Sequence, residues 1–239
     1  MKASVFDAAR ADDELATVIP CCVRHDDVVA LHVALERYRG RDAARAMHVE
    51  TLPRAFDTAF YWSEEELREL TGTTCLRDTL NLMEETREDY EQIERKLEGI
   101  GEKDWMRERG IDYERYAWAR SNLWSRQCDL LKPDGTRTRA MVPTFDIFNH
   151  SPEAPLGKTH KLNAEEGLVT VYAGRDYEVG EQAFISYGSG EAANAKLLTW
   201  YGSVSYTHLR AHETSLQLVF RLLLEKKNGG GGVGGGGGG

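Results

Sequence analysis

The spacing of hydrophobic residues changes once along this chain, and that change limits its possible folds. Between residues 28 and 124, apolar residues recur every three or four positions, which is the period of an α-helix. Between residues 141 and 187 they form short runs separated by glycines, which is typical of β-strands and turns. A helical segment followed by a strand-rich segment predicts an α+β fold.

Single segments of this pattern predict individual elements. Ser63, followed by three glutamates that end at Glu66, has the form of a capping box and predicts the start of a helix. The predicted helix 78–96 carries apolar candidate core residues, namely Leu80, Leu82, Met83, Tyr90 and Ile93. The other predicted helices are 28–38 (closed by Gly40), 113–124 and 192–200, the predicted strands are 16–20, 141–143, 168–172 and 182–187, and a polar connection is predicted at 97–112.

Composition argues against several classes of protein. The chain has 239 residues, of which 41% are hydrophobic and 29% charged, and this balance argues against a membrane protein and against disorder. A formal net charge of -9 argues against nucleic acid as a partner and suits a basic protein segment. The four cysteines form no CxxC pair and no basic-then-apolar leader opens the chain, so we expect an intracellular protein with reduced thiols.

Motifs for metal or nucleotide binding do not occur before residue 204. The sequence there contains no P-loop, GxSxG, HExxH or GxGxxG. His32 lies in the predicted helix 28–38 with no second potential ligand near it in sequence. We therefore expect His32 to be solvated or at the edge of the core, and we predict no metal site.

Residues 204–239 differ from the rest of the chain. Ten of the 23 glycines lie within residues 229–239. Residues 204–214, VSYTHLRAHET, and residues 218–227, LVFRLLLEKK, resemble the translation of a common sequencing-library adapter. We therefore expect non-native adapter and poly-glycine sequence here, and we infer no site from its two histidines at helical spacing.

Two motifs in the strand-rich segment carry the candidate chemistry. The first runs from Asp146 to Ser151 and reads DIFNHS. The second begins at Phe184 and reads FISYG, and NAKLLTWYG follows it over residues 194–202. Each motif alone is a weak indication, because Asn-His often caps a turn and Ser-Tyr-Gly often ends a strand. Their order and spacing together are more specific.

In this order and spacing, the motifs resemble those of SET-domain methyltransferases, over about residues 28–202. Short matches in the helical segment narrow the resemblance to the branch of Rubisco large-subunit methyltransferase; they are LP at 52–53, YWSEEEL at 61–67, LTGT at 70–73, WA at 118–119 and SR at 125–126. The resemblance implies a SET core with a helical insert. Its expected parts are a remnant of the first SET segment at 1–27, the insert at 28–119 and the C-terminal core at 120–203.

The resemblance also implies an activity and its residues. Family members transfer a methyl group from S-adenosylmethionine to a protein, usually to lysine, so the expected partner is a protein with an accessible lysine. The family's cofactor-binding residues correspond to Arg126, Asn149, His150 and Tyr187, and its catalytic tyrosines correspond to Tyr187 and Tyr201. Because tyrosine ordinarily has a pKa of about 10, we expect Tyr187 to orient the acceptor amine rather than to remove its proton.

Two alternatives stay open. A protein-histidine methyltransferase of the same branch would use the same cofactor, although Tyr201 favours lysine because histidine-specific members depart from Tyr-Gly there. A catalytically silent SET-like binding module is the other alternative, because residues 1–27 contain no Gly-x-Gly turn of the kind that contacts the cofactor in this family. We expect a monomer that is truncated at both ends and inactive or weak as it stands.

Overall fold

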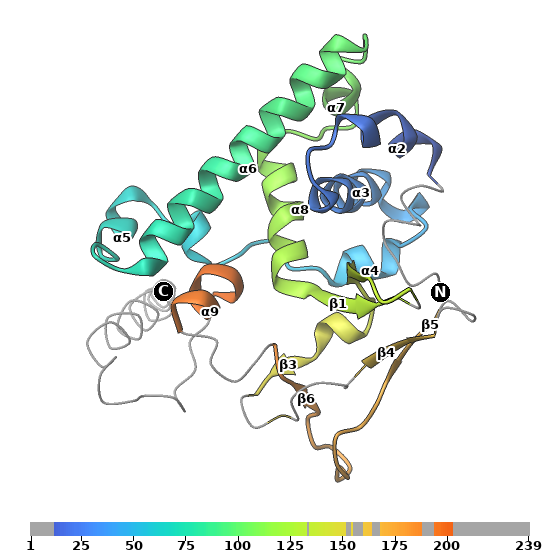
Figure 1. The fold of residues 1–239 in the computed structure, drawn as a ribbon, viewed down its shortest axis with the longest axis vertical. Coiled ribbons are helices and arrows are strands. Elements are labelled where there is room, and N and C mark those ends of the chain that lie inside the picture. The colour runs from blue at the N-terminus through green and yellow to red at the C-terminus, as the bar shows by residue number, and fades with distance from the viewer. Residues whose placement is uncertain are drawn as a thin grey trace, which may run out of the picture. The chain divides into compact units, whose positions relative to one another are not determined.

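Helices occupy the first part of the chain and short strands the second, which confirms the predicted α+β fold (Figure 1). The computed structural model describes residues 12–132, 134–151, 154, 160–163, 168–187 and 194–202, so the expected adapter sequence at 204–239 lies outside the described residues. The helices are α2 (Asp13–Val18), α3 (His25–Arg39), α4 (Ala46–Thr51), α5 (Glu64–Arg68), α6 (Thr74–Gly99), α7 (Trp105–Glu108), α8 (Tyr113–Arg126) and α9 (Asn194–Tyr201). The 3-10 turns are η1 (Ile19–Cys21), η2 (Gly40–Asp42), η3 (Ala59–Tyr61) and η4 (Phe145–Ile147), and the strands are β1 (Gln127–Leu131), β2 (Arg137–Met141), β3 (Asn149–His150), β4 (His160–Asn163), β5 (Leu168–Val171) and β6 (Phe184–Ile185).

The chain divides into two compact units. The first unit comprises Met1–Phe56 and Asn81–Glu191, and the second comprises Asp57–Leu80 and Ala192–Gly239. Helix α6 begins in the second unit and continues into the first. The boundary expected between residues 119 and 120 falls inside α8, so one continuous helix joins the expected insert to the expected core.

Helices α3 and α8 form the centre of the first unit. They pack against each other, and every residue of α3 from Asp27 to Glu36 is buried. The aromatic residues Tyr116, Trp118 and Trp124 of α8 are also buried and belong to the core. Fully burying one large apolar side chain contributes about 1.5–3 kcal/mol, so this contact is a major source of stability for the unit.

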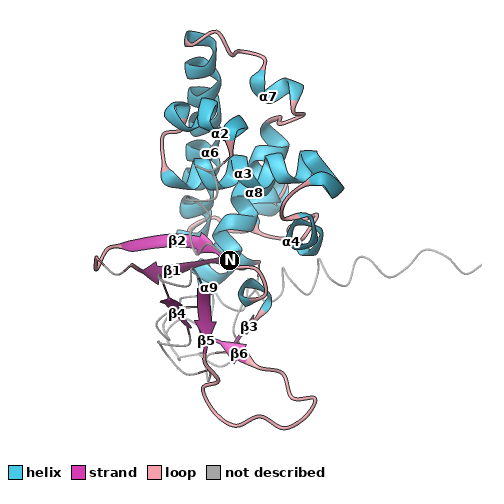
Figure 2. Cartoon of the chain, turned by 90° about the vertical axis from the view of Figure 1, so that its right-hand side faces the viewer, coloured by secondary structure: helices cyan, strands magenta, loops and turns pink. Residues whose placement is uncertain are grey.

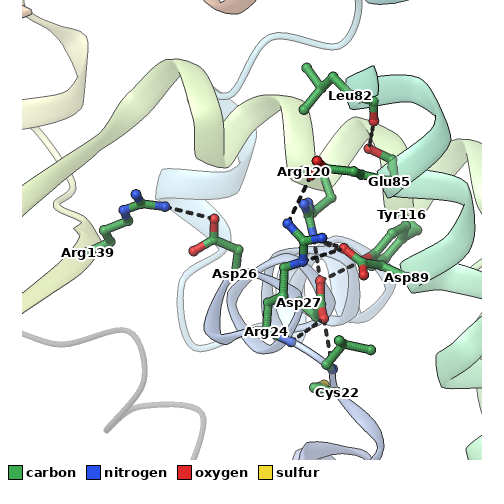
Figure 3. A network of polar contacts seen from close by, with 12 residues as sticks. Cys22, Arg24, Asp26, Asp27, Leu82, Glu85, Asp89, Tyr116, Arg120 and Arg139 are labelled. Carbon is green, nitrogen blue, oxygen red and sulfur yellow. Dashed lines mark hydrogen bonds and ion pairs between the residues drawn. The ribbon is translucent and has the colours of Figure 1, made fainter. Parts of the chain in front are cut away.

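A buried network of charges joins α3, α6 and α8 (Figure 3). One carboxylate oxygen of Asp27 accepts hydrogen bonds from the Tyr116 hydroxyl, at 2.9 Å, and from the Arg120 guanidinium. Its other oxygen accepts two backbone N–H groups just before α3, and one of them is that of Arg24 at 2.7 Å. Arg120 also lies 3.3 Å from the carboxylate of Asp89. Because buried charges are stable only when paired, the four side chains Asp27, Asp89, Tyr116 and Arg120 depend on one another.

The strands of the first unit form three pairs among the described residues (Figure 2). Strands β1 and β2 are antiparallel, with Gln127 opposite Met141, and β4 and β5 are antiparallel as well. Strands β3 and β6 run parallel, with Asn149 opposite Phe184. A parallel pair joins segments that are far apart in sequence, so this pair positions the two motifs.

The second unit contains the predicted capping box. The Ser63 hydroxyl accepts the N–H of Glu66 at 3.3 Å, and the Glu66 carboxylate accepts the N–H of Ser63 at 2.8 Å. The side chains of Cys75 in α6 and Thr199 in α9 lie 3.3 Å apart. Gly202 follows α9 with φ at 65°, and a Cβ there would lie 3.3 Å from a backbone carbonyl carbon, so glycine suits this position.

The strand predicted at 16–20 is wrong, because these residues lie in α2 and η1. The Asp12 carboxylate caps α2 by accepting the N–H of Glu14 at 3.1 Å. Leu15 and Val18, one helical turn apart, are both fully buried. Capping and burial at helical spacing therefore outweigh the strand preference of the short apolar run. Pro20 lies at the start of η1, where a missing N–H costs little.

Three predictions about burial are also wrong. His32 is 5% exposed, because α3 is covered on every side. Leu80 is 47% exposed, so it does not lie on the side of α6 that faces the core. The polar connection at 97–112 contains α7 and buries three apolar side chains, Trp105, Met106 and Ile111, while its charged side chains stay outside. None of the helices in the described part of the chain combines the length and the apolar character needed to cross a membrane.

Candidate functional site

The two sequence motifs meet where β3 and β6 pair. Asn149 lies opposite Phe184, and His150 lies opposite Ile185. The N–H of Ser151 extends the contact by donating to the Ile185 carbonyl at 3.1 Å. The structure thus brings the predicted site residues Asn149 and His150 next to the segment that ends in Tyr187.

Tyr187 is held by two hydrogen bonds to the first motif. Its backbone N–H donates to Nδ1 of His150 at 3.2 Å, so Nδ1 carries no proton and the neutral ring is protonated at Nε2. Its hydroxyl donates to the backbone carbonyl of Phe148 at 2.7 Å. The two rings lie 5.1 Å apart between centroids. Backbone and side chain together therefore fix the direction of the phenol.

The electrostatic surroundings keep the Tyr187 hydroxyl protonated. Burial raises the pKa of Tyr187 above its ordinary value, and the nearby Asp146 raises it further, while Arg126 acts in the opposite direction. At neutral pH the residue is therefore a neutral hydroxyl, which can donate or accept a hydrogen bond but cannot act as a base in the resting state.

Arg126, the last residue of α8, lies beside the first motif. Its Nη1 donates to the backbone carbonyl of Asp146 at 3.0 Å and lies 3.8 Å from the Asp146 carboxylate. Three buried polar atoms here have no hydrogen-bond partner among the described residues: Nε of Arg126, Oε1 of Gln127 and Oδ1 of Asp146. Leaving such atoms unpaired costs about 1–3 kcal/mol each, so this is a place where a polar ligand would be stabilised.

The other predicted residues have different surroundings. Asn149 is exposed to solvent, which leaves its amide accessible. The hydroxyl of Ser125, which precedes Arg126, donates to a backbone carbonyl one helical turn earlier at 2.8 Å. Tyr201 is the last residue of α9 and belongs to the second unit, whereas the other predicted site residues belong to the first.

Sequence reasoning assigned no role to two residues of this site, Asp146 and His48. The Asp146 carboxylate is fully buried, and Nε2 of His48 lies 2.7 Å from it. Asp146 is the first residue of the first motif, so the motif could have indicated it as a site residue. His48 lies 98 residues earlier in an unpatterned stretch, and nothing in that stretch indicates it.

Metal binding has no support in the described residues, where no three His, Cys, Asp or Glu side chains are grouped to hold an ion. All four cysteines are free thiols. Burial raises the pKa of Cys128 to about 12, so this thiol beside the site is not a reactive nucleophile.

Comparisons with known proteins show similarity to methyltransferases. No protein-family model matches the chain. The actin-histidine N-methyltransferase of Canis lupus familiaris is 30% identical over 144 residues, which are 59% of this chain and 24% of that protein. The enzyme of the same name from Danio rerio is 29% identical over 163 residues, which are 67% of this chain and 27% of that protein. The chain thus spans about a quarter of the length of these relatives.

Solved structures give the clearest likeness in fold. The SET domain of LSMT bound to lysine and AdoHcy superimposes with a TM-score of 0.71 at 25% identity, covering 84% of this chain and 45% of that one. Rubisco LSMT bound to AdoMet gives a TM-score of 0.69 at 25% identity, covering 84% and 44%. The chain therefore has an α+β fold of the SET-domain type, and its sequence is similar to those of SET-domain methyltransferases.

Proposed function

We propose that this chain is part of a protein methyltransferase that uses S-adenosylmethionine and acts on lysine. The observation that carries the proposal is the pairing of β3 with β6, which holds Tyr187 against His150 next to Arg126 and Asn149. The likeness to LSMT structures bound to lysine, AdoHcy and AdoMet supports the cofactor and the acceptor.

The residues present suit this cofactor. S-adenosylmethionine would supply a positively charged sulfonium that carries the methyl group to be transferred. Arg126 has a buried Nε without a partner among the described residues, and a guanidinium binds a carboxylate such as that of the methionine moiety. The exposed amide of Asn149 and the protonated Nε2 of His150 can donate hydrogen bonds to the polar groups of the cofactor.

Tyr187 would act by orientation. Its hydroxyl is directed by the Phe148 carbonyl, and burial keeps it neutral, so it can hold an acceptor amine without taking its proton. The amine must be neutral before it can attack, and removing it from water near a positive charge lowers its pKa. Positioning by the fixed phenol then contributes to the rate.

A histidine acceptor is the second candidate. The curated relatives named above are actin-histidine N-methyltransferases, and this observation favours histidine. Tyr201 favours lysine, because histidine-specific members of the branch depart from Tyr-Gly at this position. A catalytically silent SET-like binding module would transfer no methyl group to either acceptor.

Two variants test the site, and two peptides test the acceptor. Isothermal titration with S-adenosylhomocysteine should show binding to the unchanged chain and loss of binding on Asn149→Ala. Tyr187→Phe should bind the cofactor and lose transfer of a labelled methyl group. A pair of peptides that differ only by lysine or histidine at one position identifies the acceptor.

The outcomes separate the candidates. Label on the lysine peptide supports the proposal, and label on the histidine peptide alone replaces it by the second candidate. Absence of transfer to either peptide favours the silent module. Normal methylation by both Asn149→Ala and Tyr187→Phe contradicts the assignment of the site.

A further inference from the structure

His48 connects a helix of the first unit to the candidate site. It lies in α4, and its Nε2 is 2.7 Å from Oδ2 of Asp146, which lies 98 residues later in the chain. The His48 side chain is 11% exposed and the Asp146 carboxylate is fully buried. A histidine and a carboxylate this close and this sheltered form a charge-assisted or strong neutral hydrogen bond.

Asp146 contacts both His48 and Arg126, and so links the two residues. It is the middle residue of η4, and its backbone carbonyl accepts the hydrogen bond from Nη1 of Arg126 at 3.0 Å. Its carboxylate Oδ2 lies 3.8 Å from the same nitrogen. Arg126 thus binds the backbone carbonyl of Asp146, while His48 binds the carboxylate oxygen Oδ2 that lies nearest to Arg126. The other carboxylate oxygen, Oδ1, has no hydrogen-bond partner among the described residues.

The turn itself needs such support. Thr144, just before η4, has φ at 75°, a backbone conformation that β-branched residues rarely adopt. The N–H of Asp146 donates to the Val142 carbonyl at 3.0 Å, and this bond together with the His48 contact fixes the residue that faces Arg126. Asp146 begins the motif that includes Asn149 and His150, so its position also sets theirs.

Loss of the His48 contact would change which group Arg126 binds. A buried carboxylate without a donor is strongly disfavoured, and the nearest cation to Asp146 is Arg126. The guanidinium would then turn from the carbonyl to the carboxylate, because paired N–H bonds to a carboxylate are its preferred geometry. Its Nε, which has no partner among the described residues, would no longer be available for a ligand.

We propose that His48 is a positioning residue of the cofactor site: it binds Oδ2 of Asp146, the carboxylate oxygen nearest to Arg126, and so keeps Arg126 free for the carboxylate of S-adenosylmethionine. This inference rests on the proposed function, since it concerns the same site. We propose no contact of His48 with the cofactor or the acceptor. Its effect reaches the cofactor through Asp146 and Arg126.

The test measures the dissociation constant of S-adenosylhomocysteine for the full chain. His48→Leu removes the donor and should weaken binding about ten- to a hundredfold, as expected for the loss of one hydrogen bond to a charged group. His48→Gln places an amide donor near the position of Nε2 and should restore affinity, whereas the shorter His48→Asn should not. Met47→Ala changes the neighbouring residue, which is 83% exposed, and should bind as the unchanged chain does.

A second substitution distinguishes this mechanism from a simple loss of packing. If a carboxylate released from His48 captures Arg126, then Asp146→Asn in the His48→Leu background should recover part of the affinity, because an amide competes weakly for the guanidinium. A packing defect would instead worsen with the second change. Unfolding midpoints without ligand show whether each variant is folded.

Each result supports or overturns the inference. Equal affinities for His48→Leu and the unchanged chain overturn it and leave the proposed function intact. If His48→Leu does not fold, the comparison of His48→Gln with His48→Asn decides, and equal affinities of these two overturn it. If the unchanged chain binds no S-adenosylhomocysteine, the proposed function fails and the inference fails with it.

Discussion

Replacing Arg120 by methionine removes a guanidinium that contacts two buried carboxylates of the first unit, Asp27 and Asp89, and leaves Asp89 its ion pair with Arg24 at 3.2 Å. Arg120 is 2% exposed, and Asp27 and Asp89, which it contacts, are 0% and 5% exposed. Methionine fills much of the same volume, so the change isolates the charge. Breaking a buried ion pair on one side costs about 3–5 kcal/mol, because the remaining charge stays desolvated. The unfolding equilibrium constant should therefore rise roughly a hundredfold to several thousandfold.

The cost should also depend on pH. Burial raises the pKa of Asp89 even in the unchanged chain, where Arg120 opposes that effect, so removal of Arg120 raises it further. A carboxyl with a raised folded-state pKa favours the folded state once it is protonated, and this contribution is lost as pH rises through that pKa. The penalty of Arg120→Met should thus be smaller at pH values near the unfolded pKa of about 4 than at neutral pH.

Urea unfolding followed by far-ultraviolet circular dichroism measures this penalty, with linear extrapolation to water. Arg107→Met is the matched control, since that arginine is 78% exposed and its pair with Asp104 lies at the surface. Its effect should stay within about 0.5 kcal/mol. Equal unfolding free energies for the Arg120 and Arg107 variants at neutral pH would contradict this prediction, because they would show that the buried carboxylates do not depend on Arg120.

Two further predictions concern stability. Burial lowers the pKa of His32, and neither ring nitrogen has a hydrogen-bond partner among the described residues. The contribution of neutral His32 to stability is therefore fully present above the unfolded pKa of about 6.5 and is lost as pH falls through the lower folded pKa. Below this pH, the unfolding midpoint of the unchanged chain should fall more steeply with decreasing pH than that of His32→Leu. Parallel curves of midpoint against pH for the two proteins would contradict the assignment. Ser63→Ala removes the cap of the five-residue helix α5 and should cost about 1 kcal/mol, with faster amide exchange in α5, while Ser63→Thr should retain both.

Local patterns predicted the elements whose stability is local. The helical spacing of residues 28–38 matches α3, and Gly40 ends this helix with φ at 59°, where a side chain would be strained. Ser63 and Glu66 form their capping box three residues apart, so the sequence contains both partners within one turn. Residues 168–172 largely coincide with β5, whose antiparallel partner β4 lies five to eleven residues earlier in the chain. In each case the deciding interaction lies close in sequence.

Contacts between distant segments could not be predicted in the same way. The partner of Arg120 in α8 is Asp27 in α3, and periodicity alone describes Arg120 as an interruption of a core helix rather than as half of a pair. His48 meets Asp146 only after α4 and η4 have folded against the same unit. A motif resemblance indicated Asn149 and His150 as candidates because motifs reflect such distant pairings in other proteins, but the residues that carry the resemblance do not include His48.

The buried network and the candidate site both include an arginine of helix α8, but at different places along it. We therefore expect a substitution in the network to affect stability and a substitution at the site to affect cofactor binding. Arg120 is held by Asp27 in the middle of the helix, and Arg126 is held by the Asp146 carbonyl at its end. The two arginines are about 9 Å apart along the axis at a rise of about 1.5 Å per residue, and their hydrogen-bond partners are different residues. The C-terminal end of α8 has its own hydrogen bond to the first motif. A folded Arg120→Met variant should therefore retain its affinity for S-adenosylhomocysteine although it is less stable, whereas a folded His48→Leu variant should lose affinity.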